Sequence, residues 1–228
     1  KTIRGKKVYY LQIVCQGLPP SKVTKGEGVV GIDPGISTVA FTSPTEVALV
    51  DLVPKNIARK EKLLKQLDRK IERSQRVNNP ECYKENGTIK KGARFKRPSK
   101  RQLRLRARRR KVYRSLSEER KKLQGQLVNR IVSQASRIRI EELNVKGLQR
   151  RSRDIRINPK TNRPFSKKRY GKAIFRAAPS ALRVALEIRA SQLGIGIEVI
   201  SPKEVKPSQY NHITQTFDKK SLSTRVYD

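Results

Sequence analysis

A short apolar run that ends in a carboxylate constrains the fold of this chain more than any other stretch. Residues 28–35 read GVVGIDPG. The β-branched residues predict a buried strand, and Pro34-Gly35 opens a turn directly after it. Asp33 therefore stands at the end of a strand, where a lone carboxylate is costly to bury without a partner or a metal. Asp-Pro-Gly is also common turn chemistry, so on its own this stretch fits a turn-forming aspartate better.

Further strands follow on both sides of long helical patterns. Residues 36–41 and 46–53 predict two strands that form an antiparallel group with the first. Residues 137–141 alternate with period two and predict a strand that ends at Glu141, before a loop over 142–148. Residues 195–200 predict another strand. Strands separated by helices are the pattern of an α/β fold.

Three segments carry helical periodicity. Residues 56–76, 102–135 and 173–193 each repeat apolar positions at helix spacing, and the second segment is one long helix or two. The predicted apolar positions are Ile57, Leu64, Leu67 and Ile71, then Leu116, Leu123, Leu127, Val128, Ile131 and Val132, then Ile174, Ala178, Leu182, Leu186, Ala190 and Leu193. Residues 77–100 and 149–172 are turn-rich basic connectors, and 203–228 is polar and irregular.

The charge of the chain indicates its partner. Among 228 residues, Lys and Arg number 55 and acidic residues 19, a formal net charge of +36. The excess positive charges repel one another and imply a polyanionic partner. Nucleic acid is the first candidate and a membrane surface the weaker one. Cys15 and Cys82 are too few for a disulfide framework or a four-cysteine zinc site. The single histidine, His212, excludes histidine-rich metal sites.

These features together resemble the RuvC-like nuclease domain of the TnpB family, proteins encoded by insertion sequences and related to the type V CRISPR effectors. Residues 31–35 (GIDPG) are similar to the first RuvC motif of the family, and residues 140–147 (IEELNVKG) to the second. The other similar stretches are residues 78–80, 89–92, 169–172, 178–179 and 206–212. The resemblance runs over most of the chain from about residue 28 onward.

The resemblance implies an RNase H-like (RuvC) mixed sheet with flanking basic helices, and RNA-guided endonuclease cleavage of DNA. Two Mg²⁺ ions would hydrolyse the phosphodiester bond. Asp33 and Glu141 are then the expected catalytic and metal-binding residues, Asp33 between both ions and Glu141 on one. Glu142 is the weaker candidate, since on a strand it faces away from Glu141.

The chain departs from the family in one respect that matters for catalysis. The third acid, usually an Arg-Asp pair that begins a helix, is absent, and Asp218 and Asp228 are poor substitutes in polar sequence. Because the chain begins abruptly with a strand pattern over 8–15, we expect residues 1–27 to be the end of a preceding β-rich, wedge-like domain with its linker. Residues 28–228 are then a RuvC-like domain, interrupted by a basic segment at 77–115 and lacking its C-terminal part.

Two other functions remain open. One is a nuclease-inactive RNA-guided DNA-binding protein, and the other is a basic structural RNA-binding protein of ribosomal type. The expected partners are a guide RNA, target double-stranded DNA and their RNA–DNA heteroduplex, with no membrane, in a prokaryotic cytoplasm near the nucleoid. The remainder of the same polypeptide or a second subunit would supply what is missing. The basic stretches at 94–100, 104–114, 150–156 and 167–169 are expected to contact phosphates.

Overall fold

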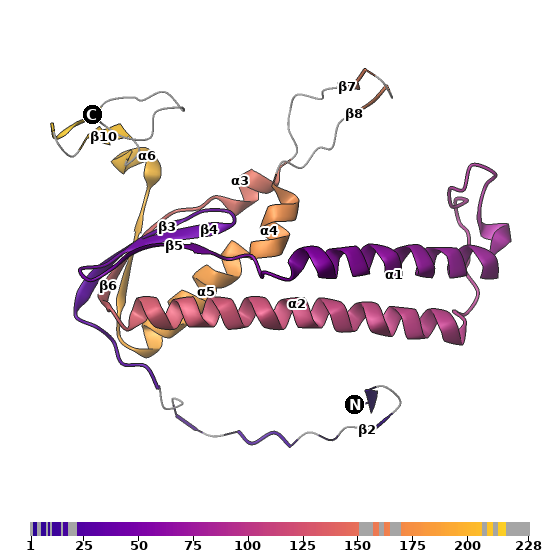
Figure 1. The fold of residues 1–228 in the computed structure, drawn as a ribbon, viewed down its shortest axis with the longest axis horizontal. Coiled ribbons are helices and arrows are strands. Elements are labelled where there is room, and N and C mark those ends of the chain that lie inside the picture. Colours follow the sequence, from indigo (N-terminus) through magenta and orange to yellow (C-terminus); the bar gives the residue numbers. More distant parts are fainter. Residues whose placement is uncertain are drawn as a thin grey trace.

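Two main parts can be distinguished among the described residues, a sheet with helices packed on one face and a long two-helix arm that extends away from it (Figure 1). The computed structural model describes residues 2–3, 6–7, 9, 11–14, 16–17, 22–150, 157–159, 162–164, 170–206, 209–211 and 214–217. Strands and helices alternate along the described residues, which confirms a mixed α/β protein.

A five-stranded mixed sheet forms the first part, in the order β5-β4-β3-β6-β9. The strands are β3 (Gly28–Pro34), β4 (Thr38–Thr42), β5 (Val47–Asp51), β6 (Ala135–Glu141) and β9 (Gly196–Ile200). β3, β4 and β5 are antiparallel neighbours, whereas β6 runs parallel to β3, and β9 parallel to β6. All five strands were predicted from the sequence to within a few residues. The pairing makes β3 central, with its antiparallel partner on one side and its parallel partner on the other.

The arm is an antiparallel pair of long helices, α1 (Ile57–Asn78) and α2 (Lys100–Val132). α2 is a single helix, which settles the choice between one helix and two. Its Ser99 cap accepts a hydrogen bond from the Gln102 backbone N–H at 3.2 Å. At the far end of the arm, the short 3₁₀-helix η1 (Pro80–Cys82) and a loop join the two helices (Figure 1). The buried Asn79 holds this loop, because its amide donates to the Gln75 carbonyl and accepts from the Lys96 N–H.

The two helices of the arm pack together mainly through the predicted apolar positions. Ile57, Leu64, Leu67 and Ile71 are the buried residues of α1, as predicted. On α2 the prediction was wrong at Leu123, which is 36% exposed, and Gln124 is buried instead. The physical reason is a tertiary contact: Gln124 Nε2 donates to the carbonyls of Ala177 (2.9 Å) and Ala178 (3.1 Å).

The segment predicted as one helix over 173–193 is two helices, α4 (Gly171–Ala177) and α5 (Pro179–Gln192). The break falls at Ala178, whose φ of 50° lies in the left-handed region. Pro179 disfavours the helical conformation of the residue before it, so the helix stops there and a second begins on the proline. Gln124 then pairs with the carbonyls that the break leaves free.

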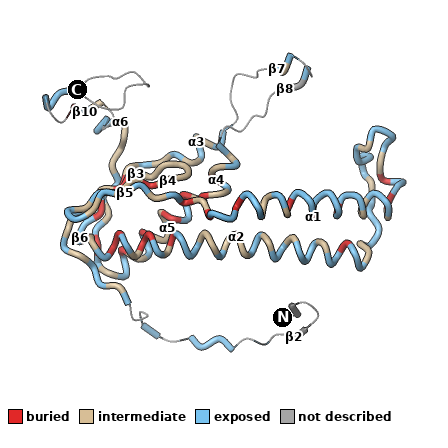
Figure 2. Tube along the Cα trace, viewed as in Figure 1, coloured by how far each residue is buried: buried red, intermediate tan, exposed pale blue. Residues whose placement is uncertain are grey.

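One face of the sheet packs against α2 and α5 and contains the main core. Val30 and Ile138 from the sheet, Ile131 from α2 and Leu186 from α5 are each at most 2% exposed. Figure 2 shows the buried residues concentrated where these elements meet, while the arm is mostly exposed with a thin buried seam. The alternate sheet residues, among them Val29, face the other way and are exposed. Burial therefore fixes which strand residues can face outward.

The remaining described elements are short. They are β1 (Thr2–Ile3), β2 (Lys6–Lys7), α3 (Val145–Gln149), β7 (Ile157–Asn158), β8 (Arg163–Pro164), α6 (Pro202–Val205), β10 (Tyr210–Asn211) and β11 (Thr216–Phe217). α3 corrects the predicted loop over 142–148, because Asn144 Oδ1 accepts from the Gly147 N–H at 2.8 Å and starts a helical turn.

The predicted strand over 8–15 is wrong for its described residues, 9 and 11–14. These residues form no strand, and Tyr9, Leu11 and Val14 are each at least 85% exposed. A strand needs a neighbour for its backbone hydrogen bonds, and an apolar sequence alone does not supply one. Within the described residues, no helix is long and apolar enough to cross a membrane.

Candidate active site

Asp33 lies at the exposed end of the central strand. It is the penultimate residue of β3, directly after Ile32, which is buried in the core. Because strand side chains alternate, Asp33 faces the opposite side of the sheet, where it is exposed. The turn that follows is tight: a Cβ on Gly35 would lie 2.8 Å from the Thr38 carbonyl oxygen. Glycine at this position lets the chain reverse into β4 and leaves Asp33 at the sheet edge.

Glu141 occupies the matching position on the next strand. It is the last residue of β6, which runs parallel to β3 with Ile32 paired to Ile140. Asp33 and Glu141 are thus each one residue beyond a paired, buried isoleucine, and they face the same side of the sheet. The structure therefore brings the two predicted carboxylates together at the C-terminal ends of adjacent parallel strands.

The two carboxylates affect each other electrostatically. The pKa of Glu141 is raised above its usual value of 4.5, first because the group is partly buried and second because the negative charge of Asp33 opposes its ionisation. Among the described residues, no lysine or arginine forms an ion pair with either carboxylate. A divalent cation between them would relieve this repulsion, and carboxylate oxygens are the ligands that Mg²⁺ uses.

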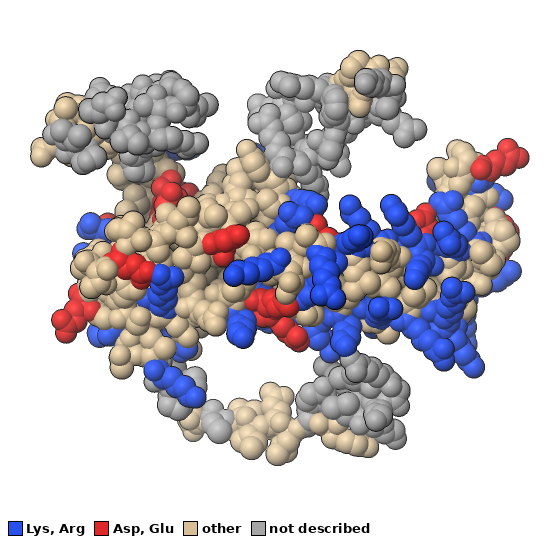
Figure 3. Space-filling view, viewed as in Figure 1, with Lys and Arg blue, Asp and Glu red and all other residues tan. Residues whose placement is uncertain are grey.

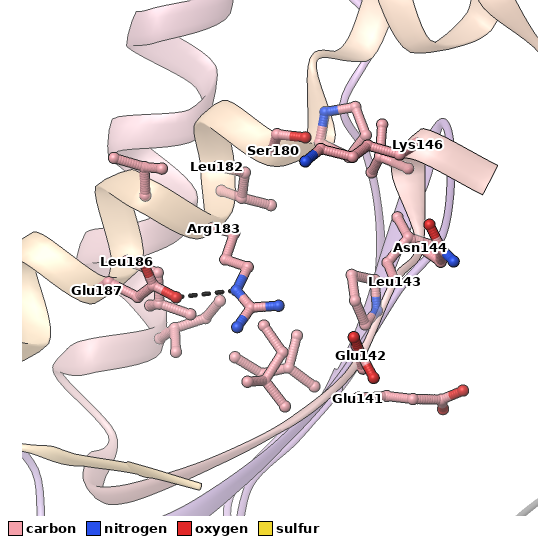
Figure 4. Close-up of a pocket in the computed structure, with 17 residues that line it drawn as sticks. Glu141, Glu142, Leu143, Asn144, Lys146, Ser180, Leu182, Arg183, Leu186 and Glu187 are labelled. Atoms are coloured by element: carbon pink, nitrogen blue, oxygen red, sulfur yellow. Dashed lines mark hydrogen bonds and ion pairs between the residues drawn. The ribbon is translucent and has the colours of Figure 1, made fainter. Parts of the chain in front are cut away.

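Glu142 follows directly but lies outside the strand. Its backbone N–H donates to the Ile200 carbonyl at 2.9 Å, which ties the end of β6 to the end of β9. Its side chain borders a cleft of about 490 Å³ between the ends of β3 and β6, α3 and α5. In Figure 4 the carboxylate of Glu141 extends away from this cleft.

The cleft beside the acids has an apolar floor and a charged rim. Ile32, Ile140 and Leu182 contribute to the floor, and the Arg183–Glu187 ion pair (2.8 Å) crosses one side (Figure 4). Arg183 and Glu187 were not singled out from the sequence, although their spacing of four residues on a helix is the usual signal for such a pair.

A third carboxylate does not join the pair in the part of the chain that the structure describes. There, no three or more Asp, Glu, His or Cys residues group closely enough to hold a metal ion. Asp218, Asp228 and His212 lie outside the described residues, as does Cys15. Cys82 is buried, and its thiol donates to the Arg94 carbonyl.

The cationic stretches are concentrated on the arm. Figure 3 shows Lys and Arg side chains gathered over α1 and α2 on the face in view. The predicted contact stretches at 94–100 and 104–114 belong to the arm, whereas 151–156 and 167–169 lie outside the described residues. Sequence reasoning missed that cations from α1 and α2 line a common cleft, which depends on how the two helices face each other.

Comparison with known proteins finds distant structural likeness and no sequence match. No protein-family model matches the chain, and no curated protein matches it. Among solved structures, a chain of the cryo-EM structure of the Cas12f1–sgRNA–target DNA complex aligns with a TM-score of 0.36 and 14% identity. The alignment covers 80% of this chain and 31% of that chain, so this chain spans about a third of its length.

Proposed function

We propose that this chain is the RuvC-like, RNase H-like nuclease part of an RNA-guided DNA endonuclease of the TnpB type. The observation that carries the proposal is the pairing of Asp33 and Glu141 on one sheet face, at the ends of β3 and β6. The two residues lie far apart in the sequence, and in the part of the chain that the structure describes neither carboxylate forms an ion pair. A turn-forming aspartate would need no such neighbour.

The donor set fits a hard divalent cation. Both side chains offer carboxylate oxygens, and partial burial followed by the negative charge of Asp33 raises the pKa of Glu141. Asp33 and Glu141 would hold Mg²⁺. When bound, the metal would activate water and stabilise the leaving oxygen of the phosphodiester bond. Glu141 would also help to orient the attacking water.

The charge of the chain supports nucleic acid as the partner. A net charge of +36 on 228 residues favours binding to a phosphate backbone, with counterion release on binding. In the proposed complex, base pairing between a guide RNA and the target DNA reads the sequence, while the protein contacts backbone and shape. The proposed partners are the guide RNA, the target duplex and their heteroduplex.

Cleavage of a target plasmid tests the proposal. The protein, co-expressed with the RNA from its native transposon end, should linearise or nick the plasmid with Mg²⁺ and lose this activity with EDTA. Asp33→Asn and Glu141→Gln should each reduce cleavage at least 100-fold, since each removes a metal ligand. Glu198→Gln is the matched control, because Glu198 lies on the neighbouring β9 and pairs with Arg139 at 3.0 Å. Equal activity in all four proteins would refute the assigned site.

A nuclease-inactive, RNA-guided DNA-binding protein is the second candidate. The observation in its favour is that the described residues group two carboxylates at the site and not three. It predicts guided binding of the target without cleavage, unchanged by Asp33→Asn. A gel-shift assay run beside the cleavage assay distinguishes the two candidates.

A further inference from the structure

A second cleft lies between the two helices of the arm, formed by residues outside the candidate active site. It has a volume of about 590 Å³, within the range of ligand pockets. Its walls come from one flank of α1, at positions 59, 62, 63 and 66, and one flank of α2, at positions 108, 111, 112 and 115. These spacings of three and four residues place each set on a single helix face.

Cations form the rim of this cleft, and apolar side chains form part of its lining. Arg59 and Lys62 from α1 face Arg108 and Lys111 from α2, and all four are exposed. We call these four residues the arm cations. Leu63 and Val112 are partly buried and contribute an apolar surface between them. The cleft therefore combines several positive charges with an apolar patch, a combination that suits a sugar–phosphate chain.

The neighbouring acids do not neutralise the arm cations. Glu61 pairs with Arg176 and Lys172, and Asp68 pairs with Arg109. Glu119 pairs with Lys60. Among the described residues, no ion pair includes any arm cation. Four like charges around one cleft repel one another, and an anion between them would stabilise the arm.

The cleft is preformed by a fixed contact between the helices. Lys60 Nζ on α1 donates to Ser115 Oγ on α2 at 2.8 Å, and also to the carboxylate of Glu119. The apolar contacts among Ile57, Leu64 and Leu116 lie close by. Because these contacts set the distance between α1 and α2, the arm cations stand apart at a defined spacing. Binding of a ligand then costs less conformational entropy, because the two helices need not be ordered first.

We propose that this cleft binds the phosphodiester backbone of a nucleic acid strand, with the arm cations contacting consecutive phosphates and Leu63 and Val112 contacting a sugar. The inference rests on the proposed function only in taking nucleic acid as the partner. RNA and DNA share this backbone chemistry, so the strand type is determined by experiment. The cleft acts as a second anchoring point that holds the nucleic acid along the arm.

The test compares two variants of the full chain with equal charge. The cleft variant is Arg59→Gln, Lys62→Gln, Arg108→Gln and Lys111→Gln. The matched control is Lys65→Gln, Arg69→Gln, Lys121→Gln and Lys122→Gln, four exposed cations of the same helices that neither line the cleft nor belong to the stretches expected to contact phosphates. Fluorescence anisotropy measures binding of labelled single-stranded RNA, single-stranded DNA and an RNA–DNA duplex at several salt concentrations. Thermal unfolding checks that both variants fold.

We expect the cleft variant to lose at least 10-fold in affinity for at least one of the three nucleic acids near 150 mM salt, and the control less than 3-fold. The slope of log K against log salt should fall by about one for each phosphate that the protein no longer neutralises, in the cleft variant only. The nucleic acid with the largest difference identifies the bound strand type. Equal losses of affinity in both variants would overturn the proposal, because the cations would then act only through the overall charge of the arm.

Two further variants separate this inference from the proposed function. Arg59→Lys with Arg108→Lys keeps the positive charge and should retain most of the affinity, whereas loss equal to that of the cleft variant would contradict phosphate contact. Asp33→Asn should bind as the wild type does. A cleft-specific loss of binding in a protein that never cleaves DNA would leave the cleft standing and refute the nuclease. Normal cleavage by the cleft variant, with unchanged binding, would refute the role of the cleft and leave the proposed nuclease standing.

Discussion

At the scale of single residues, Glu141 shows how the sheet places a carboxylate where its charge is unfavourable. Its pKa is raised by partial burial and by the charge of Asp33. A group whose pKa is raised in the folded state stabilises the fold while protonated and loses that contribution as the pH rises through the raised pKa. Such an unfavourable charge, held at a defined position, is typical of a functional site.

Glu141→Gln should therefore stabilise the metal-free protein near neutral pH. The variant removes the ionised carboxylate that burial and Asp33 disfavour, so its melting temperature at pH 7 should exceed that of the wild type. Below about pH 4.5, where Glu141 is protonated in both states, the difference should vanish. Millimolar Mg²⁺ should raise the melting temperature of the wild type more than that of the variant. A variant less stable than the wild type at pH 7 would contradict this account.

At the scale of elements, ion pairs join the arm to the rest of the molecule. Glu61 on α1 accepts from Arg176 on α4 through both carboxylate oxygens, at 2.7 and 2.5 Å. Lys172 lies 3.3 Å away with a mostly exposed side chain, whereas the side chains of Glu61 and Arg176 are 18% and 29% exposed. The hydrogen bond from Arg176, followed by that from Lys172, lowers the pKa of Glu61 to about 2. This contact fixes α1 against α4 near the start of the arm.

Glu61→Gln should lower the free energy of unfolding at pH 7 by about 2 kcal/mol, the usual effect of losing a hydrogen bond to a charged group. Because the pKa of Glu61 is lowered, its contribution is complete above about pH 4.5 and declines as the pH falls toward about 2. The difference between wild type and variant, measured by urea unfolding, should shrink over this range. A difference that stays constant from pH 7 to pH 3 would show that the ion pair is not its source.

The elements also show what could be predicted from the sequence. The stripe of α1 was predicted residue by residue, because a helix with one buried face repeats it in its sequence. The burial of Gln124 was missed because it depends on hydrogen bonds to carbonyls of a distant segment, those of Ala177 and Ala178. The break at Ala178 was missed although Pro179 is a local signal for it. Residues 11–14 have a strand composition but no strand partner. Local pattern determines an element, whereas its neighbours decide whether and where it ends.

The functional sites show the same distinction, because some of their residues could be predicted from the sequence and others could not. Asp33 and Glu141 could be found because each ends a strand pattern, and the parallel pairing of β3 and β6 then brings them together. The arm cleft could not be found, because helical spacing gives the faces of α1 and α2 separately but not which flanks meet. The arm cations Arg59 and Arg108 are 49 positions apart in the numbering of the chain, and their shared cleft exists only after the helices pack.

At the scale of the whole molecule, charge is the dominant feature. A net charge of +36 destabilises the compact state through self-repulsion, and Figure 3 shows much of this charge on the arm. The pairing of Glu61, Asp68 and Glu119 with cations reduces the repulsion only locally. A bound polyanion would neutralise the rest.

Salt should therefore stabilise the nucleic-acid-free protein. Raising NaCl from about 50 to 500 mM shortens the range of the repulsion, and each kcal/mol removed should raise the melting temperature by roughly 2–4 °C. Differential scanning fluorimetry measures the change. A melting temperature that falls steadily with salt would mean that favourable ion pairs outweigh the net repulsion.

We propose that Asp33 and Glu141 together hold a divalent metal ion. The most direct measurement is a titration of the full chain with Mn²⁺, followed by electron paramagnetic resonance, since Mn²⁺ takes the oxygen ligands that suit Mg²⁺. The account predicts a class of bound Mn²⁺ in the wild type that is lost in Asp33→Asn and in Glu141→Gln, retained in Glu198→Gln, and displaced by Mg²⁺. Binding that is the same in all four proteins, or absent from the wild type, would contradict it.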